Sequence, residues 1–307
     1  MKKISFKYKS SNREHFISAT KYIPDDKENI KGIVQIAHGM FEHTNRYANF
    51  IKFIVSRGYI VCINDHVGHG ESLLNDEIGY MGTDSIHETM VKDMYILTRI
   101  MKVEYPDYKY ILLGHSMGSF LARYYCTNFS KFIDGVILSG TGNKVIFNNL
   151  LIHITNTIIK LNGNKKEAMF FQKCMNNFFN FKFKSENSNF NWLSKNYRSV
   201  ENFLKDPKCG FTFRYEGYRD LLKLINIVNE KSWYEIFPKK MPVYIFSGDM
   251  DPVGNYGKGV IQVYNNLKKY GAEDVTLKLY KDGRHEMLNE VNNVEVFNDT
   301  YLWIESH

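Results

Sequence analysis

The chain of 307 residues is 44% hydrophobic, which supports a sizeable core and excludes a disordered protein. Its net charge of +7 is spread along the sequence without a basic stripe, so we expect no binding to nucleic acid. Lys2 and Lys3 precede no apolar signal-peptide run, and the four cysteines are widely spaced, which together predict a cytoplasmic protein with reduced thiols.

Short apolar runs alternate with helical patterns along the first half of the chain. Strands are predicted at 32–37, 59–63, 110–113 and 135–138, and helices at 46–57 and 86–104. Gly58 has the position of a helix C-cap, and Pro106 follows the end of the second helix. Strands separated by helices of this length predict a parallel sheet that is covered on both faces.

The alternation stops near Asn143 and resumes with a strand at 242–246. The residues between them are rich in Asn, Lys and Phe, and their periodicity is helical. We therefore predict an α/β core of residues 1–142 and 236–307, with a helical cap inserted at 143–235. A helix at 256–270, a strand at 275–280 and a terminal helix from about residue 291 complete the predicted core.

A G-x-S-x-G motif, Gly114 to Gly118, lies between the strand at 110–113 and a helix-like run at 120–125. The motif alone is common by chance, but a sharp strand-to-helix turn exposes a serine hydroxyl at the edge of a sheet. The flanking glycines lack the Cβ atoms that would clash in so tight a turn. Ser116 is therefore the predicted nucleophile.

A serine nucleophile needs a base, and hydrolases of this α/β type carry the serine, the acid and the histidine in that chain order. Only three histidines follow Ser116. His153 falls in the cap and His307 is terminal, whereas His285 comes in the loop after the strand at 275–280. His285 is therefore the predicted base.

Two carboxylates are candidates for the acid that orients His285, because Asp249 and Asp251 both follow the strand at 242–246. Pro252 restricts the backbone of Asp251 and favours a fixed direction for its carboxylate. Asp249 has the alternative role of a turn residue that binds nearby backbone N–H groups. Asp251 is the favoured acid, and Asp249 is kept as the alternative.

Backbone N–H groups should stabilise the oxyanion that forms during acyl transfer. One donor is expected from the residue after the nucleophile, Met117, and the other from Met40 in the loop after the strand at 32–37. Their side chains carry no chemistry in this interpretation.

A second His-rich turn, residues 65–72, could form a metal site together with His38 and His43. The spacing matches no zinc motif, so we expect a hydrogen-bonded turn that supports the sheet edge. The sequence predicts neither a metal nor an organic cofactor.

The motifs at 38–43, 65–72, 114–118, 247–253 and 283–286 together resemble the α/β-hydrolase superfamily, in particular its monoacylglycerol lipase and lysophospholipase-like branch. In the cap, residues 191–194 and 206–211 resemble bacterial members, so the likeness runs nearly end to end. The resemblance implies a triad of Ser116, Asp251 and His285. It also implies oxyanion donors at Met40 and Met117, and a cap that forms the acyl-binding channel.

The substrate implied by the resemblance is a carboxylic ester such as a monoacylglycerol or a lysophospholipid. Thioesters, amides and small peptides are alternatives for the same triad, and a non-catalytic binder is the alternative outside enzymes. The cap residues Phe170, Phe171, Phe178 and Phe179 are candidates for an apolar acyl tunnel, or they pack the cap's own core. Transient contact of the cap with a membrane surface is a further hypothesis.

Overall fold

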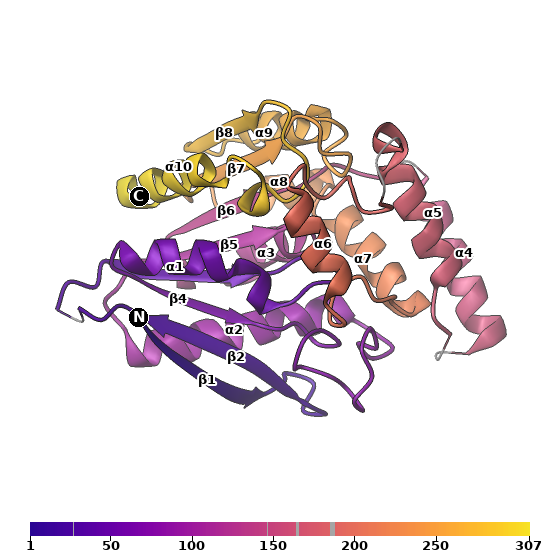
Figure 1. The fold of residues 1–307 in the computed structure, drawn as a ribbon, viewed down its shortest axis with the longest axis horizontal. Helices are drawn as coiled ribbons and strands as arrows, with labels where there is room; N and C mark the ends of the chain where they lie inside the picture. The colour runs from indigo at the N-terminus through magenta and orange to yellow at the C-terminus, as the bar shows by residue number, and fades with distance from the viewer. Residues whose placement is uncertain (27, 146, 164–165, 185–187) are drawn as a thin grey trace.

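The computed structural model describes residues 1–26, 28–145, 147–163, 166–184 and 188–307. Within these ranges one sheet of eight strands has the order β1-β2-β4-β3-β5-β6-β7-β8 (Figure 1). The strands are β1 (Lys2–Lys9), β2 (Phe16–Ile23), β3 (Gly32–Ala37), β4 (Tyr59–Asn64), β5 (Tyr110–His115), β6 (Gly135–Ser139), β7 (Val243–Gly248) and β8 (Val275–Tyr280). β1 and β2 pair antiparallel, as do β2 and β4, and all other neighbours are parallel.

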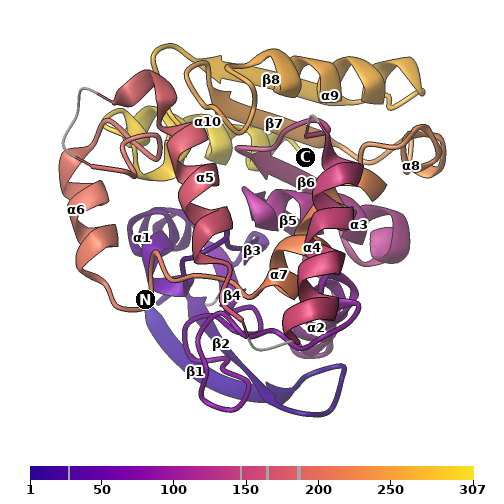
Figure 2. The same cartoon turned by 90° about the vertical axis from the view of Figure 1, so that its right-hand side faces the viewer.

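The central strands are mostly apolar and are buried along their whole length, because helices cover both faces of the sheet. Successive residues point to opposite faces, so that Ile33 joins one hydrophobic cluster and Val34 joins the other. Residues of α1 (Ala48–Ser56) and α10 (Asn293–Ser306) pack on one face. Residues of α2 (Ile86–Glu104), α3 (Met117–Phe129) and α9 (Lys258–Lys269) pack on the other (Figures 1 and 2). The predicted α/β-hydrolase fold is thereby confirmed.

The first two strands were not predicted from the sequence. In β1 the partly buried Ile4 and Phe6 alternate with exposed residues, and Tyr8 is buried at the same spacing. This alternation is the pattern of an antiparallel strand with one wet face. The lysines around these residues make the segment strongly polar on average, so its alternation is easily overlooked in the sequence.

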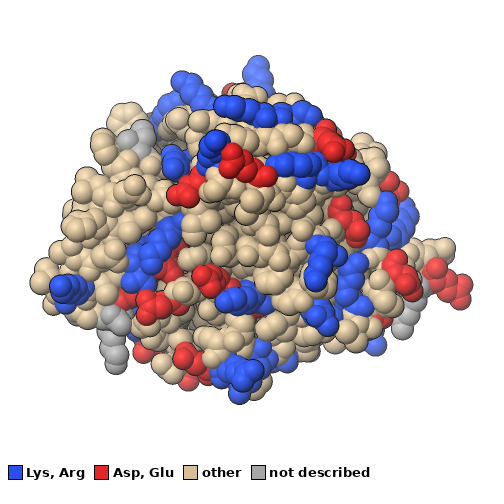
Figure 3. All heavy atoms as spheres, turned by 180° about the vertical axis from the view of Figure 1, so that it is seen from behind, with Lys and Arg blue, Asp and Glu red and all other residues tan. Residues whose placement is uncertain are grey.

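Between β6 and β7 the chain forms helices rather than strands in the residues that the structure describes. They are α4 (Asn148–Asn162), α5 (Met169–Phe179), α6 (Tyr197–Lys205), α7 (Tyr215–Ile227) and α8 (Lys231–Ile236). Figure 2 looks onto α4 to α7, which stand in front of one end of the strands. None of the helices in the described ranges combines the length and the hydropathy needed to cross a bilayer. On the back of the molecule, Lys and Arg are interspersed with Asp and Glu (Figure 3).

Candidate active site

Ser116 stands at the sharp turn that joins β5 to α3. Its φ of 52° and ψ of −120° are strained for a residue other than glycine. Ser116 is partly exposed, although the residues on either side of it are buried. A Cβ at Gly114 would lie 2.2 Å from the Gly118 carbonyl oxygen, and one at Gly118 would lie 2.1 Å from that of Ala37. The turn therefore closes only with glycine at both positions.

The structure brings Asp251, rather than Asp249, against His285. His285 Nδ1 lies 2.9 Å from Asp251 Oδ2, and both side chains are buried. Asp251 Oδ2 also accepts a hydrogen bond from Ser247 Oγ at 2.9 Å, and Oδ1 accepts one from the Val253 N–H at 2.9 Å. Within the described residues, Asp249 makes no hydrogen bond or ion pair with His285. The carboxylate of Asp251 is thus fixed in direction.

The surroundings of His285 favour its protonated form. Burial lowers the pKa of His285, but the charge and hydrogen bond of Asp251, followed by the charges of Glu286 and Glu42, raise it above the usual 6.5. Because Asp251 accepts the proton on Nδ1, Nε2 is the nitrogen left to act as a base. His285 and Ser116 line one pocket, although no hydrogen bond joins their side chains in the described part of the chain. Such bonds often tighten only when substrate binds.

The loop after β3 lies directly against the serine. A Cβ at Gly39 would be 3.2 Å from Ser116 Cβ. The Gly39 N–H donates to Glu42 Oε1 at 2.5 Å, which holds the loop in place. Among the described residues, the backbone N–H groups of Met40 and Met117 have no hydrogen-bond partner. Both are therefore available to a ligand.

A buried ion cluster behind this loop was missed by the sequence analysis. Arg46 contacts the carboxylates of both Glu42 and Glu286. The Tyr47 hydroxyl donates to Glu42 Oε1 at 2.7 Å. Burial and the charge of Glu286 raise the pKa of Glu42 to about 7, while Arg46 and the hydrogen bonds oppose that rise. No local pattern links Arg46 to Glu286, because 240 residues separate them.

The three histidines near the second His-rich turn are structural supports. His38 and His66 have ring centroids 4.2 Å apart, and His38 Nε2 accepts the His66 N–H at 2.9 Å. His38 Nδ1 lies 2.8 Å from the Gly39 carbonyl oxygen, and His69 Nδ1 lies 2.9 Å from that of Val67. Burial lowers the pKa of His38 and of His69 to about 3, so both rings are neutral.

The segment between β6 and β7 supplies the apolar wall of the pocket around Ser116. This wall consists of Phe190, Trp192, Leu193 and Phe203. Trp192 lies with its ring 5.0 Å from that of His285, measured between centroids. Aromatic and aliphatic walls with a few polar groups are typical of pockets for small organic ligands.

The four cap phenylalanines named from the sequence lie elsewhere, and none of them lines this pocket. Phe170 and Phe178 are 76% and 70% exposed. Phe171 packs against Tyr218 and Phe179 against Trp192, each pair with centroids 4.9 Å apart. Helical spacing could not separate the face that meets the core from the face that meets solvent.

Known proteins resemble this chain over nearly its whole length. A profile of the family described as serine aminopeptidase, S33, matches residues 28–292. A monoacylglycerol lipase of Mycolicibacterium smegmatis is 25% identical over 285 residues, which are 90% of this chain and 89% of that protein. Human monoglyceride lipase is 23% identical over 286 residues, covering 89% of this chain and 82% of its own.

A solved structure also resembles this chain over its whole length. A thermostable carboxyl esterase from Bacillus coagulans, solved in complex with glycerol, superposes with a TM-score of 0.92 and 30% identity. That match covers 100% of this chain and 99% of the esterase. The chain therefore belongs to the serine aminopeptidase S33 family of α/β-hydrolases.

Proposed function

We propose that this protein hydrolyses monoacylglycerols or lysophospholipids through an acyl-enzyme formed on Ser116. The relatives named monoacylglycerol lipase and carboxyl esterase support a hydrolase that acts on ester bonds. One structural observation supports the proposed acyl-enzyme on Ser116. The buried pair of His285 and Asp251 borders the same pocket as Ser116, the serine held on the strained turn.

In the proposed mechanism, Ser116 Oγ attacks the ester carbonyl while His285 Nε2 removes its proton. Asp251 holds the ring and stabilises the imidazolium that forms. His285 then protonates the leaving alcohol, and afterwards activates a water that releases the acid. No step needs a cofactor.

The negative charge that develops on the carbonyl oxygen would be bound by the N–H groups of Met40 and Met117. Support comes from the position of the Gly39 loop against Ser116 and from the absence of partners for these two donors in the described residues. Donors fixed before the reaction stabilise the transition state without reorganising, and losing one typically costs about 10²–10³ in rate.

The pocket favours an acyl ester over a peptide with a free amino group. An aminopeptidase needs an unpaired carboxylate to bind the substrate ammonium group. Here Glu42 and Glu286, the carboxylates of the pocket, are both engaged by Arg46. The remaining cap wall is apolar. The names of the relatives agree, since the Mycolicibacterium smegmatis protein is a monoacylglycerol lipase and the Bacillus coagulans esterase was solved with glycerol.

A second cavity, of only about 10 Å³, borders Met117. It is lined mostly by apolar side chains of α2, α3 and α7, among them Met90, Leu121 and Leu224. Phe41, which borders the Ser116 pocket, packs on Phe213, which borders this cavity, with ring centroids 4.6 Å apart. We propose that these two rings must separate, and the cavity widen, before an acyl chain can enter it.

We further propose that residues 143–235 act as a cap whose outer helices touch the lipid surface. Large hydrophobic side chains are exposed along α4 and α5, namely Leu150, Ile154, Leu161, Met169, Phe170 and Phe178. The flank formed by these helices carries mostly uncharged side chains at the left of Figure 3.

The four cysteines are all free, which supports the prediction of a reducing, cytoplasmic location.

Hydrolysis of a short p-nitrophenyl ester tests the nucleophile. Ser116→Ala should abolish turnover and labelling by a fluorophosphonate without altering the unfolding temperature. Retained turnover would overturn the assignment. Asp251→Asn should lower kcat by about 10⁴, as the loss of the orienting acid does in comparable triads, whereas Asp249→Asn serves as the matched control.

A substrate panel tests the specificity. Monoacylglycerols and lysophospholipids should be hydrolysed with higher kcat/KM than acyl-CoA, amino-acid amides or dipeptides. Faster cleavage of an amino-acid amide would favour the aminopeptidase alternative. The Ser116→Ala protein gives the background for each compound.

A further inference from the structure

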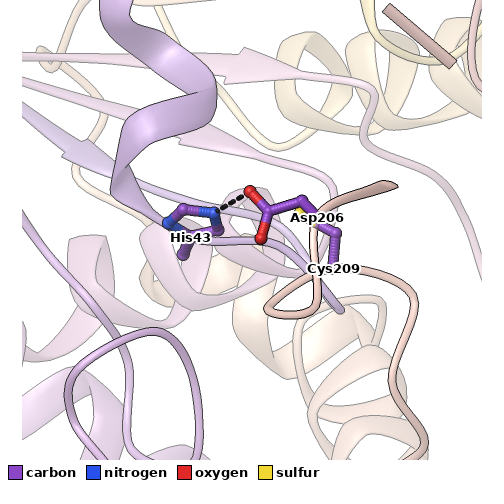
Figure 4. Close-up of side chains that lie close together, drawn as sticks. All are labelled: His43, Asp206 and Cys209. Atoms are coloured by element: carbon purple, nitrogen blue, oxygen red, sulfur yellow. Dashed lines mark hydrogen bonds and ion pairs between the residues drawn. The ribbon is translucent and has the colours of Figure 1, made fainter. Parts of the chain in front are cut away.

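Three potential metal ligands meet beside the loop that carries Met40. They are His43, which follows that loop, and Asp206 and Cys209 from the turn after α6 (Figure 4). One ligand atom from each residue lies within 4.8 Å of the other two. His43 Nε2 is 2.9 Å from Asp206 Oδ2. Residues more than 160 positions apart in the chain thus present nitrogen, oxygen and sulfur to one point.

The backbone already has a shape suited to holding a cation. The Cys209 N–H donates to the Asp206 carbonyl oxygen at 2.9 Å, which closes a tight turn of four residues. This Asp-x-x-Cys turn presents two ligands at the spacing that Cys-x-x-Cys turns use in zinc sites. The Lys208 N–H donates to Asp206 Oδ1 at 2.9 Å and orients the carboxylate from outside. The Gly210 N–H donates to the Phe41 carbonyl oxygen at 2.9 Å and fixes the turn to the core.

Burial and charge favour a cation at this position. His43 and Cys209 are only 5% and 8% exposed, so their donor atoms are shielded from bulk water. Two cations lie nearby, but both are paired with carboxylates: Glu42 and Glu286 share Arg46, and Lys208 pairs with Glu71. A divalent ion with one thiolate and one carboxylate forms a neutral unit, and that limits the cost of burying charge.

We propose that His43, Asp206 and Cys209 bind a zinc-class divalent cation, with water as the fourth ligand. The imidazole nitrogen and the thiolate select zinc over magnesium or calcium, which prefer oxygen ligands. On binding, the Cys209 thiol releases its proton to solvent and the His43 proton resides on Nδ1. The ion would join the turn after α6 directly to the loop that carries Met40. This site is separate from the proposed hydrolysis and does not depend on it.

Metal binding to tag-free protein tests the proposal without any assay of hydrolysis. The Cys174→Ser protein is the suitable background, because Cys174 is the exposed cysteine among the four. Titration calorimetry with Zn²⁺ should show one ion bound per chain with release of a proton. Co²⁺ should give the tetrahedral visible bands and a thiolate-to-cobalt charge-transfer band.

Single substitutions identify the ligands. Cys209→Ser, Asp206→Asn and His43→Gln should each weaken Zn²⁺ binding by more than the roughly 10–100-fold that loss of an outer hydrogen-bond partner costs. Cys209→Ser should also remove the charge-transfer band. His153→Gln, a change in an outer helix of the cap, is the matched control and should leave both signals unchanged.

Several results would overturn the site. They are Zn²⁺ affinity that survives Cys209→Ser, a Co²⁺ spectrum without the thiolate band, or loss of the signal with His153→Gln. If Cys209→Ser fails to fold, the Co²⁺ spectrum of the Cys174→Ser protein still decides, because Cys62 and Cys126 are buried in the core and belong to no group of three potential metal ligands among the described residues.

Discussion

Two regions between β6 and β7 differ in their contact with the core. One is residues 191–196, here called the inner cap strip, and the other is the pair of helices α4 and α5. The inner strip is bonded to the loop of His285, since the Leu193 carbonyl accepts the Glu286 N–H at 2.7 Å. Glu290 accepts the Lys195 N–H at 2.8 Å and the Asn196 N–H at 3.2 Å. By contrast, α4 and α5 expose large apolar side chains. One part of the cap helps to build the site, and the other faces outward.

Glu290→Ala should separate these two roles most strongly, because it removes several of the hydrogen bonds between the inner strip and the histidine loop. Glu290 is 1% exposed, and its loss removes the acceptor of the Lys195 N–H and of the Ser194 hydroxyl. We expect the free energy of unfolding to fall by about 2–4 kcal/mol, together with a large loss of kcat. Chemical denaturation and ester hydrolysis measure both.

Glu295→Ala is the matched control, since Glu295 pairs with Lys278 at the surface. Its effect should be far smaller. Equal effects of the two substitutions would contradict a special role for the inner strip.

Changes on α4 and α5 should act on membrane contact alone. In Phe170→Asp/Phe178→Asp, two exposed rings are replaced by charges, so binding to liposomes should weaken by about 10–100-fold. Hydrolysis of a water-soluble ester should not change. Phe16→Asp on β2 removes a ring that is 57% exposed outside the cap and serves as the control. Co-sedimentation that is equal for all three proteins would remove the proposed lipid-facing role.

The smallest expected effect is a shift of the pH profile. The base must be neutral, so kcat/KM should rise with pH and reach half its plateau above pH 6.5, because the pKa of His285 is raised. Glu286→Gln removes one charge that raises this pKa and should move the midpoint to lower pH. Glu201→Gln, at the exposed pair with Lys205, should leave it unchanged. A midpoint unaffected by Glu286→Gln would contradict the electrostatic coupling.

The same pKa shift affects stability with a defined sign. Because the pKa of His285 is higher in the folded protein than the usual 6.5, its contribution to stability is fully present below pH 6.5. The contribution is lost as the pH rises through the folded-state pKa. As the pH rises, deprotonation of His285 should therefore raise activity and lower stability.

The site residues that could be predicted from the sequence are each marked by a pattern of nearby residues. Ser116, Asp251 and His285 each follow a strand that the sequence predicts, and chain order limits the partners of the serine. By contrast, the Ser194 hydroxyl donates a hydrogen bond to Glu290, which is 96 positions away, and no sequence periodicity indicates such a pair. For the same reason the pocket wall could not be predicted from the phenylalanines of α5. Packing, rather than composition, decides which ring faces the serine.

The order of the strands has a consequence for synthesis. Ser116 leaves the ribosome well before Asp251 and His285, which come after the whole insertion, in the loops that follow the last two strands of the chain. A nascent chain that ends before β7 would hold the serine turn without acid or base, and so would be inert. Fluorophosphonate labelling during cell-free translation would therefore report the moment when β7 and β8 dock, because domains commonly fold as units while the chain emerges.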